Sequence, residues 1–89
     1  MKSVSQTNQF LKDIKRIQKR GKDLAKIKQI VNLLASGQKL PAQYKDHSLI
    51  GNWKGARDCH VEPDWVLIYR LSENELNLVR TGTHSDLFE

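Results

Sequence analysis

The chain has 89 residues, of which 38% are hydrophobic and 28% are charged, and its formal net charge is +5. A chain of this length forms one domain, expected to span residues 1–89, and leaves no room for a second core. The excess of basic residues favours a polyanionic partner, such as nucleic acid, the ribosome or an acidic protein.

The single cysteine, Cys59, excludes an internal disulfide and fits a reducing compartment. We interpret it as a small buried hydrophobe, with a catalytic nucleophile as the alternative. No apolar run approaches the ~20 residues of a membrane span. The first ten residues also lack the apolar core of a signal peptide. We therefore expect a cytoplasmic protein that makes no contact with a membrane.

The first third of the chain predicts a basic helical hairpin. Good N-cap residues precede two runs in which apolar residues recur at helical spacing, and a glycine follows each run. The expected helices lie between Thr7 and Gly21 and between Asp23 and Gly37. Their short connection makes them an antiparallel pair. A weakly alternating segment before them, residues 2–5, is a candidate edge strand.

The second half of the chain predicts strands. Residues 49–61 are interpreted as a strand with turns or bulges at Gly51 and Gly55. Residues 65–71 are nearly continuously apolar and predict the strongest strand, and residues 76–80 alternate like a half-buried one. Short turns make these strands antiparallel. We therefore expect an α+β fold in which the N-terminal helical hairpin packs on a small antiparallel β-sheet.

All three histidines, His47, His60 and His84, lie in this second half. His60 and Asp64 flank a tight turn, so they are expected to lie close together. His84 follows the last strand, and residues 85–89 are expected to form a short tail. Where the ends of these strands converge, three imidazoles and one carboxylate would line a single cleft. Imidazole titrates near neutral pH and can exchange protons with a substrate there.

Basic residues near the histidines are candidates to hold a phosphate: Lys45, Lys54, Arg57 and Arg80. The combined set suits cleavage of RNA without a metal. A histidine would take the proton of a ribose 2′-OH, which then attacks the adjacent phosphorus. A second group would protonate the leaving 5′ oxygen, while a cation stabilises the pentacoordinate phosphorus. Because the 2′-OH is held beside its target, the reaction gains from proximity.

Other interpretations of the same residues compete with this one. A histidine is most often a surface or structural residue, and Asp64 is also a good turn residue. Three histidines and an aspartate can bind zinc, although these spacings match no zinc motif. Trp53 and Trp65 are either core residues or stacking platforms for bases. The lysine-rich helix face is either merely solvated or binds phosphates.

Several linked motifs run through the second half of the chain: Tyr44-Lys45-Asp46-His47, Trp53-Lys54-Gly55, Arg57-Asp58-Cys59-His60, Pro63-Asp64-Trp65, and Arg80-Thr81-Gly82-Thr83-His84 through Leu87-Phe88. Together they resemble the YafQ branch of the RelE/ParE toxin superfamily. The resemblance spans nearly the whole chain. It implies a RelE-like α+β fold and the toxin of a type II toxin–antitoxin pair.

The resemblance further implies a ribosome-dependent endoribonuclease that cuts mRNA in the A site and needs no metal or other cofactor. By position, the catalytic set of the branch falls on His47, His60, Asp64 and His84. His84 is expected to be the general acid, and Asp64 or His60 is expected to handle the 2′-OH proton. Arg80 would contact the scissile phosphate, and Phe88 would stack on or position a base.

The implied partners are a cognate antitoxin that wraps and inhibits the toxin, the 70S ribosome and mRNA. The antitoxin would also provide an indirect contact with DNA, and its wrapping segment would fold on binding. Two alternatives stay open. One is a non-catalytic basic module that binds RNA or protein, and the other is a gyrase-directed toxin of the same superfamily.

Overall fold

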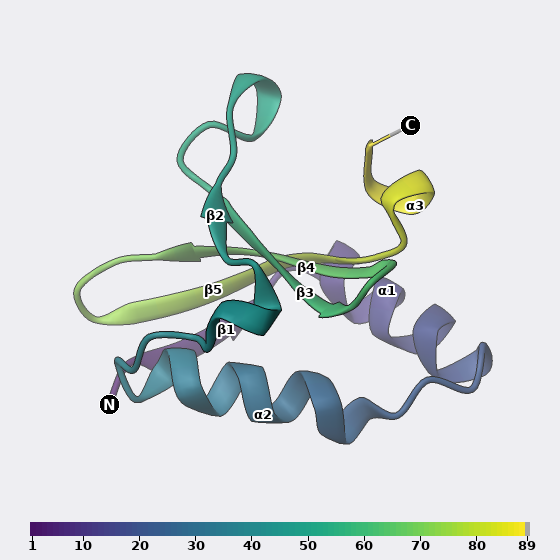
Figure 1. The fold of residues 1–89 in the computed structure, drawn as a ribbon, viewed down its shortest axis with the longest axis horizontal. Coiled ribbons are helices and arrows are strands. Elements are labelled where there is room, and N and C mark those ends of the chain that lie inside the picture. The colour runs from purple at the N-terminus through teal and green to yellow at the C-terminus, as the bar shows by residue number, and fades with distance from the viewer. Residues whose placement is uncertain (89) are drawn as a thin grey trace.

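The computed structural model describes residues 1–88 and shows a twisted sheet with two helices below it (Figure 1). In chain order the elements are β1 (Ser3–Gln6), α1 (Asn8–Lys19), α2 (Leu24–Ala35), the 3-10 turn η1 (Ala42–Tyr44), β2 (His47–Ser48), the 3-10 turn η2 (Gly51–Trp53), β3 (Arg57–Glu62), β4 (Trp65–Leu71), β5 (Glu75–Gly82) and α3 (His84–Phe88). The predicted α+β fold, with a helical hairpin packed on a small sheet, is confirmed.

The five strands form one sheet in the order β1-β5-β4-β3-β2. Neighbours from β2 to β5 are antiparallel, as predicted for the last three strands; the short strand β2 was not predicted. The candidate N-terminal strand is present as β1, but it pairs with β5 in parallel, so the sheet is mixed. A parallel pair needs a long connection, and here the rest of the chain separates the two strands.

Local signals in the sequence set the beginnings of both long helices. The hydroxyl of Thr7 accepts the backbone N–H of Phe10 at 2.9 Å, and the carboxylate of Asp23 accepts that of Ala25 at 2.9 Å. Both helices therefore begin where the sequence predicts. Their apolar stripes pack on the sheet and bury the side chains of Phe10, Ile17, Ile27, Ile30 and Leu34.

The central strand, β4, is buried on both faces of the sheet. Trp65, Leu67 and Tyr69 pack with the core that the helices cover, which we call the helix face. Val66 and Ile68 pack on the opposite side, which we call the open face. All five side chains have 0% exposure. A strand covered on both faces needs apolar residues throughout, which explains why its sequence does not alternate with polar residues.

Three predicted boundaries differ from the structure. Residues 49–61 are not one strand, because the chain leaves the sheet after β2 and returns only at β3. Gly51 and Gly55, with φ of 68° and 91°, provide the left-handed turns of this η2 loop (residues 49–56). The last strand continues to Gly82. The expected tail is helical over residues 85–88, and Glu89 lies outside the described residues.

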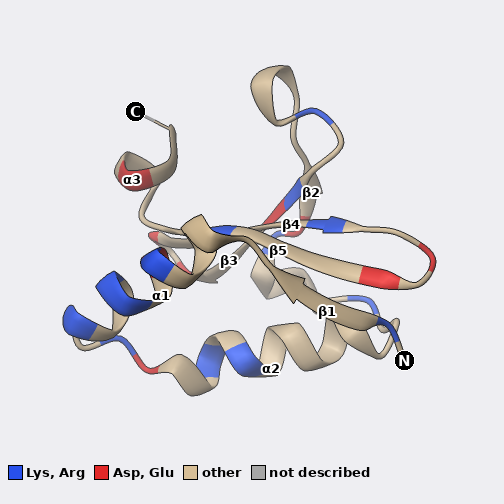
Figure 2. Ribbon diagram, turned by 180° about the vertical axis from the view of Figure 1, so that it is seen from behind, with Lys and Arg blue, Asp and Glu red and all other residues tan. Residues whose placement is uncertain are grey.

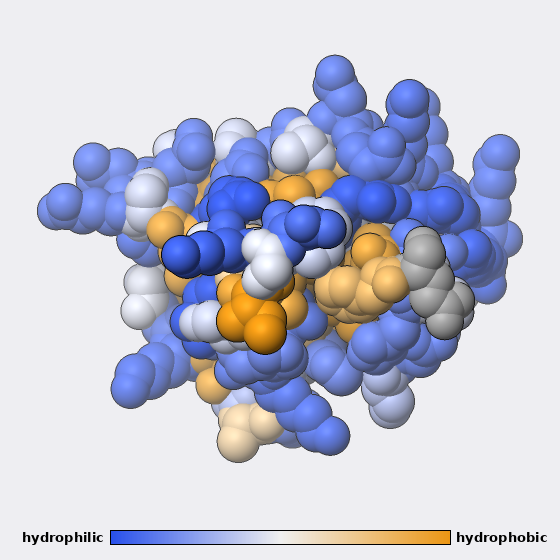
Figure 3. Space-filling model, turned by 90° about the horizontal axis from the view of Figure 1, so that it is seen from above, coloured by the Kyte–Doolittle hydropathy of each residue, from blue (hydrophilic) through white to orange (hydrophobic). Residues whose placement is uncertain are grey.

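The arrangement leaves two projections above the open face: the η2 loop at one side and α3 at the other (Figure 1). Figure 3 looks onto this face and shows apolar side chains between hydrophilic ones. None of the helices within residues 1–88 combines the length and the apolar character needed to cross a bilayer.

Candidate active site

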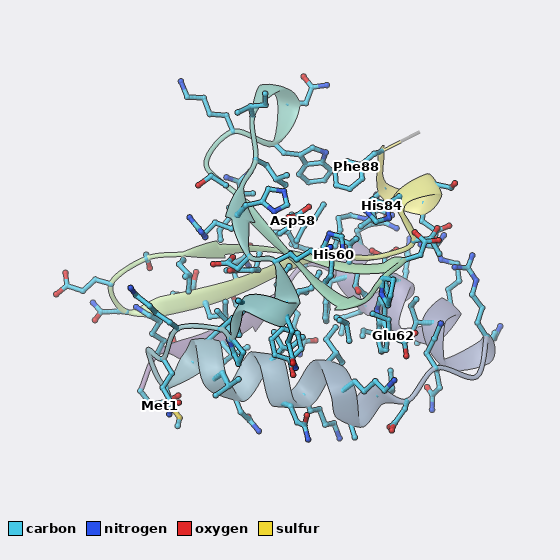
Figure 4. The ribbon with its side chains drawn as sticks, in the orientation of Figure 1. Met1, Asp58, His60, Glu62, His84 and Phe88 are labelled. Atoms are coloured by element: carbon cyan, nitrogen blue, oxygen red, sulfur yellow. The ribbon has the colours of Figure 1, made fainter. Side chains whose placement is uncertain are left out.

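The open face brings together the three histidines, which come from different elements. His47 lies on β2, His60 on β3, and His84 begins α3. The rings of His60 and His84 meet edge to face, with centroids 5.3 Å apart and an interplanar angle of 64°. Figure 4 shows His60 and His84 on the upper side of the sheet, between the η2 loop and α3. We call the three imidazoles the histidine cluster.

His84 is oriented by the carboxylate of Asp64, which lies in the turn between β3 and β4. Asp64 Oδ1 accepts the backbone N–H of His84 at 3.0 Å and lies 2.6 Å from its ring Nδ1. These two hydrogen bonds hold the pKa of Asp64 below its ordinary value, and the bond from the backbone N–H has the larger effect. A carboxylate accepts, so Nδ1 carries a hydrogen and Nε2 is left for a substrate. The partner of Asp64 is therefore His84, whereas its position in the turn had suggested that it would lie beside His60.

Reciprocal hydrogen bonds fix the start of α3. The Thr83 hydroxyl accepts the N–H of Asp86 at 3.1 Å, and the Asp86 carboxylate accepts the N–H of Thr83 at 3.0 Å. Arg20, just after α1, donates to the same carboxylate at 2.7 and 3.3 Å and holds the pKa of Asp86 well below its usual range. A threonine followed three residues later by an acidic residue is a signal for the start of a helix. The prediction of a tail over residues 85–89 did not use this signal.

Two aromatic side chains stand beside the cluster, one on each projection. Phe88 of α3 lies 6.1 Å from His84 and 6.5 Å from Trp53 of the η2 loop, measured between ring centroids. Trp53 is partly buried against the apolar patch of the open face, so it has a packing role there. Phe88 is 41% exposed and therefore accessible to a ligand.

Beneath the cluster lies a carboxylate that the sequence interpretation did not assign to the site. Asp58 has a side-chain exposure of 5%, and its Oδ1 lies 2.9 Å from His47 Nε2. Burial raises the pKa of Asp58, and the charges of His47, His60 and His84 act in the opposite direction. The signal for Asp58 was its position two residues before His60, because alternate residues of a strand share a face.

His47 is held at both ring nitrogens. Its Nδ1 lies 2.9 Å from the carbonyl oxygen of Lys45, and its Nε2 makes the close contact with Asp58. A carbonyl only accepts, so Nδ1 carries a hydrogen. The contact at Nε2 places the imidazole directly over a buried carboxylate oxygen that has no other partner within the described residues.

Arg57 is not brought to the histidine cluster. It is adjacent to Asp58, so its side chain lies on the other face of the strand, and it pairs in register with Tyr69. Arg57 donates to the Asp46 carboxylate at 3.2 and 3.0 Å, and the Tyr69 hydroxyl donates to the same group. The expected phosphate-binding role of Arg57 is not supported by this placement. Asp46 and His47 are thereby attached to opposite faces of the sheet.

Arg80 lies on β5, two residues before the end of that strand. Its Nε and Nη2 donate to the fully buried carboxylate of Asp13 at 2.8 and 3.1 Å. Burial alone raises the pKa of Asp13, but hydrogen bonds from Arg80, the Thr81 N–H and Gln9 outweigh it and leave the pKa lowered. The guanidinium is thus fixed in place, with Nη1 not engaged by Asp13. Asp13 is a second residue missed from the sequence.

The remaining candidates occupy two different environments. Lys45 and Lys54 are exposed at the ends of η1 and η2, on either side of β2 in the chain. Cys59 is fully buried on the helix face, and burial raises the pKa of its thiol. A protonated thiol facing away from the histidines cannot serve as their nucleophile. Within residues 1–88 no three His, Cys, Asp or Glu side chains are grouped to hold a metal ion.

Known proteins share both the sequence and the fold. The family described as "Bacterial toxin of type II toxin-antitoxin system, YafQ" matches residues 2–89. The mRNA interferase toxin YafQ of Escherichia coli K12 is 51% identical over 88 residues, which cover 98% of this chain and 96% of that protein.

Two solved structures extend the likeness to three dimensions. The crystal structure of YafQ from E. coli strain BL21(DE3) is 49% identical, with a TM-score of 0.95 and full coverage of both chains (100%). A chain of the E. coli DinJ-YafQ complex is 50% identical, with a TM-score of 0.93 and the same coverage (100%). The chain therefore belongs to the YafQ family of bacterial toxins of type II toxin–antitoxin systems, and its fold is RelE-like.

Proposed function

We propose that the chain is an endoribonuclease toxin that cuts mRNA in the A site of the ribosome. The observation that carries this proposal is the pair of imidazoles, His60 and His84, 5.3 Å apart on an accessible face, with a third imidazole held against a buried carboxylate. Such a set can take one proton and give another within the same reaction. The name mRNA interferase toxin, given to the E. coli relative, supports the same activity.

His60 is assigned as the general base. Within residues 1–88 its ring makes no hydrogen bond that would occupy a nitrogen, and it lies beside the expected acid. It takes the proton of the ribose 2′-OH, whose oxygen then forms a bond to the adjacent phosphorus. The bond from phosphorus to the 5′ oxygen breaks. The products are a 2′,3′-cyclic phosphate and a 5′-hydroxyl end, so no covalent intermediate with the protein is needed.

His84 is assigned as the general acid that protonates the leaving 5′ oxygen. Its Nδ1 is engaged by Asp64, so the proton is delivered from Nε2. Asp64 therefore acts by orienting His84, and we no longer assign it the 2′-OH proton.

His47 and Arg80 are assigned to the charge that develops on the phosphate. The Asp58 carboxylate lies against the ring of His47, and the Asp13 contact fixes the guanidinium of Arg80. Positive groups that are fixed before the reaction stabilise the pentacoordinate phosphorus without reorganising. Phe88 positions a base through its exposed ring. Because the nucleophile belongs to the substrate, the reaction needs no metal.

The surface charge suits a large RNA partner. Lysines and arginines follow α1 and the first half of α2, on the helix side of the sheet (Figure 2). The exposed Lys45 and Lys54 extend this charge to the open face. Phosphate contacts of this kind supply affinity and position without reading the sequence. We assign the ribosome and its mRNA as the partners of this surface.

A cognate antitoxin is the second proposed partner. The E. coli relative has been crystallised as the DinJ-YafQ complex, and the family is defined by toxin–antitoxin pairing. An antitoxin segment that folds on binding would cover the basic toxin and block its access to the ribosome. Contact with DNA would then be indirect, through the antitoxin.

The test is expression in a bacterial host from a tightly repressed promoter, with the 5′ ends of mRNA mapped on translating ribosomes. Wild type is compared with His84→Ala and with Ser85→Ala, a control at the exposed neighbour in the same helix. We expect cuts with wild type and with Ser85→Ala, and none with His84→Ala. Growth arrest by the wild type without any cut would overturn the proposed function.

A further inference from the structure

A cavity of about 300 Å³ adjoins the histidine cluster at His60. Its walls come from η1 and from the end of β3 with the turn that follows, and they include Gln43, Tyr44, Lys45, His60, Val61 and Pro63. A volume of this size is at the low end of the range for small-molecule sites. The cavity suits one flat ring system better than a length of peptide.

The cavity exists because a turn, and not a strand, lies along this part of β3. β2 pairs with β3 only at Arg57 and Asp58, so the pairing stops before His60. η1 packs against β3 in place of a further strand and leaves a gap. The edge of an unpaired strand presents backbone N–H and C=O groups, which can bond the edge of a ligand.

The side chains around the gap match the requirements of a nucleobase. Tyr44 supplies an aromatic ring that is partly buried against the helix-face core, so its position is fixed. Gln43 is exposed and carries both a hydrogen-bond donor and an acceptor. Proteins recognise unstacked bases of RNA by aromatic stacking combined with hydrogen bonds to the base edges.

The cavity is also coupled to the cluster through its backbone. Lys45, at the end of η1, has a left-handed conformation with φ of 50°. Its carbonyl oxygen is the group that lies 2.9 Å from His47 Nδ1. The same turn therefore forms a wall of the cavity and orients His47.

We propose that this cavity binds the base of the nucleotide immediately 5′ of the cut, with Tyr44 stacking on the base and Gln43 reading its edge. The proposal rests on the proposed function. His60 faces the 2′-OH of that nucleotide and lines the cavity. His84 and Phe88 lie together and face the nucleotide on the other side of the cut. The two bases that flank the scissile phosphate thus have separate sites.

The experiment measures cleavage on ribosomes that carry mRNAs differing only at the nucleotide immediately 5′ of the cut. Gln43→Ala is compared with Gln18→Ala, the same change at an exposed position of α1. We expect Gln43→Ala to reduce the discrimination between bases by roughly two- to tenfold, the worth of one hydrogen bond. Tyr44→Leu is expected to lower kcat/KM by roughly 5- to 150-fold through lost stacking.

Gln43 is exposed, so its loss tests the cavity even where Tyr44→Leu destabilises the fold. An unchanged base preference in Gln43→Ala overturns the proposal, whether the rate stays the same or falls equally for every base. Weaker antitoxin binding with the same preference also overturns it. If the wild type makes no cut, the proposed function has failed. If the wild type cuts and Gln43→Ala behaves like Gln18→Ala, only the base site has failed.

Discussion

The helix face and the open face are built from alternate residues of the same strands, yet they differ in what they bury. On the helix face of β3 lies Cys59, fully buried among apolar neighbours. On its open face lie Asp58 and His60, next to each other on one side of the strand. The buried part of the helix face at this strand is apolar, whereas the open face also keeps polar groups that a reaction can use.

Two adjacent residues show how this difference is maintained. Burial raises the pKa of both the Cys59 thiol and the Asp58 carboxyl. For Asp58 the three imidazoles oppose the effect of burial, whereas no cation does so at Cys59. A buried acid can therefore retain its charge on the open face, while the thiol stays neutral. The comparison teaches that the available partners, more than the depth of burial, distinguish the two faces.

The largest effect on activity is expected on the open face, from His60→Ala and His84→Ala. Each removes one partner in proton transfer and should lower kcat roughly 10²- to 10⁴-fold. Both rings are partly exposed, so the melting temperature should stay near that of the wild type. The check is cleavage on ribosomes beside a thermal melt. Full cleavage by either variant would contradict the assigned roles.

The matching change on the helix face is Leu67→Ala, which should act on stability alone. Leu67 has 0% exposure, and emptying such a site costs about 2–5 kcal/mol. The measurement is urea unfolding, followed by cleavage at a temperature where the variant is still folded. Gln18→Ala, at an exposed position of α1, is a control that should unfold like the wild type. Strong loss of cleavage by folded Leu67→Ala would show that the two faces are coupled.

A smaller change in stability is expected for Asp13→Ala, which removes the buried acceptor of Arg80. Because Arg80 is partly exposed, the cost should be about 2–3 kcal/mol, below that of a fully buried pair. Arg80 would also lose its fixed position, so kcat should fall while binding of RNA stays close to normal. Single-turnover cleavage separates the two effects. If kcat is unchanged in the folded variant, Arg80 has no role that depends on Asp13.

Asp58→Asn should change stability and activity in opposite directions. The pKa of Asp58 is raised in the folded state, so the protonated carboxyl favours folding. This contribution to the free energy of unfolding is fully present below the ordinary pKa of 3.8, and it is lost as pH rises through the pKa of the folded state. The variant should therefore be more stable than wild type at pH 7 and lose this advantage below pH 3.8. Cleavage should fall roughly 10²-fold, since His47 loses its anchor. Melts from pH 3 upward test this directly.

The smallest effect on activity is expected for Cys59→Ala. Cys59 is buried on the helix face, away from the imidazoles, so cleavage should be unchanged. A modest loss of stability, about 1 kcal/mol, should accompany the smaller side chain. Alkylation of the native wild type should likewise be slow, because the thiol is buried and protonated. Rapid inactivation by a thiol reagent would contradict this placement.

Features that depend on local signals could be predicted from the sequence. The caps at Thr7 and Asp23 gave the helix beginnings, and the apolar run of β4 gave the central strand. The separation of Arg57 from the site could not be predicted, because it depends on the register of β3 with its neighbours. Asp58 was missed for the same reason. A carboxylate is recognised as a site residue only when the strand face it shares with His60 is known.

The attachment of Asp46 and His47 to opposite faces has a consequence for how the length of this segment can vary. Asp46 is held by Arg57 and Tyr69 on one side of the sheet, and His47 by Asp58 on the other. Inserting or deleting one residue would exchange the two sides and turn His47 away. Homologues should therefore keep the spacing between these residues fixed, although the segment is exposed. Insertions should be tolerated instead in the η2 loop, where the chain has left the sheet.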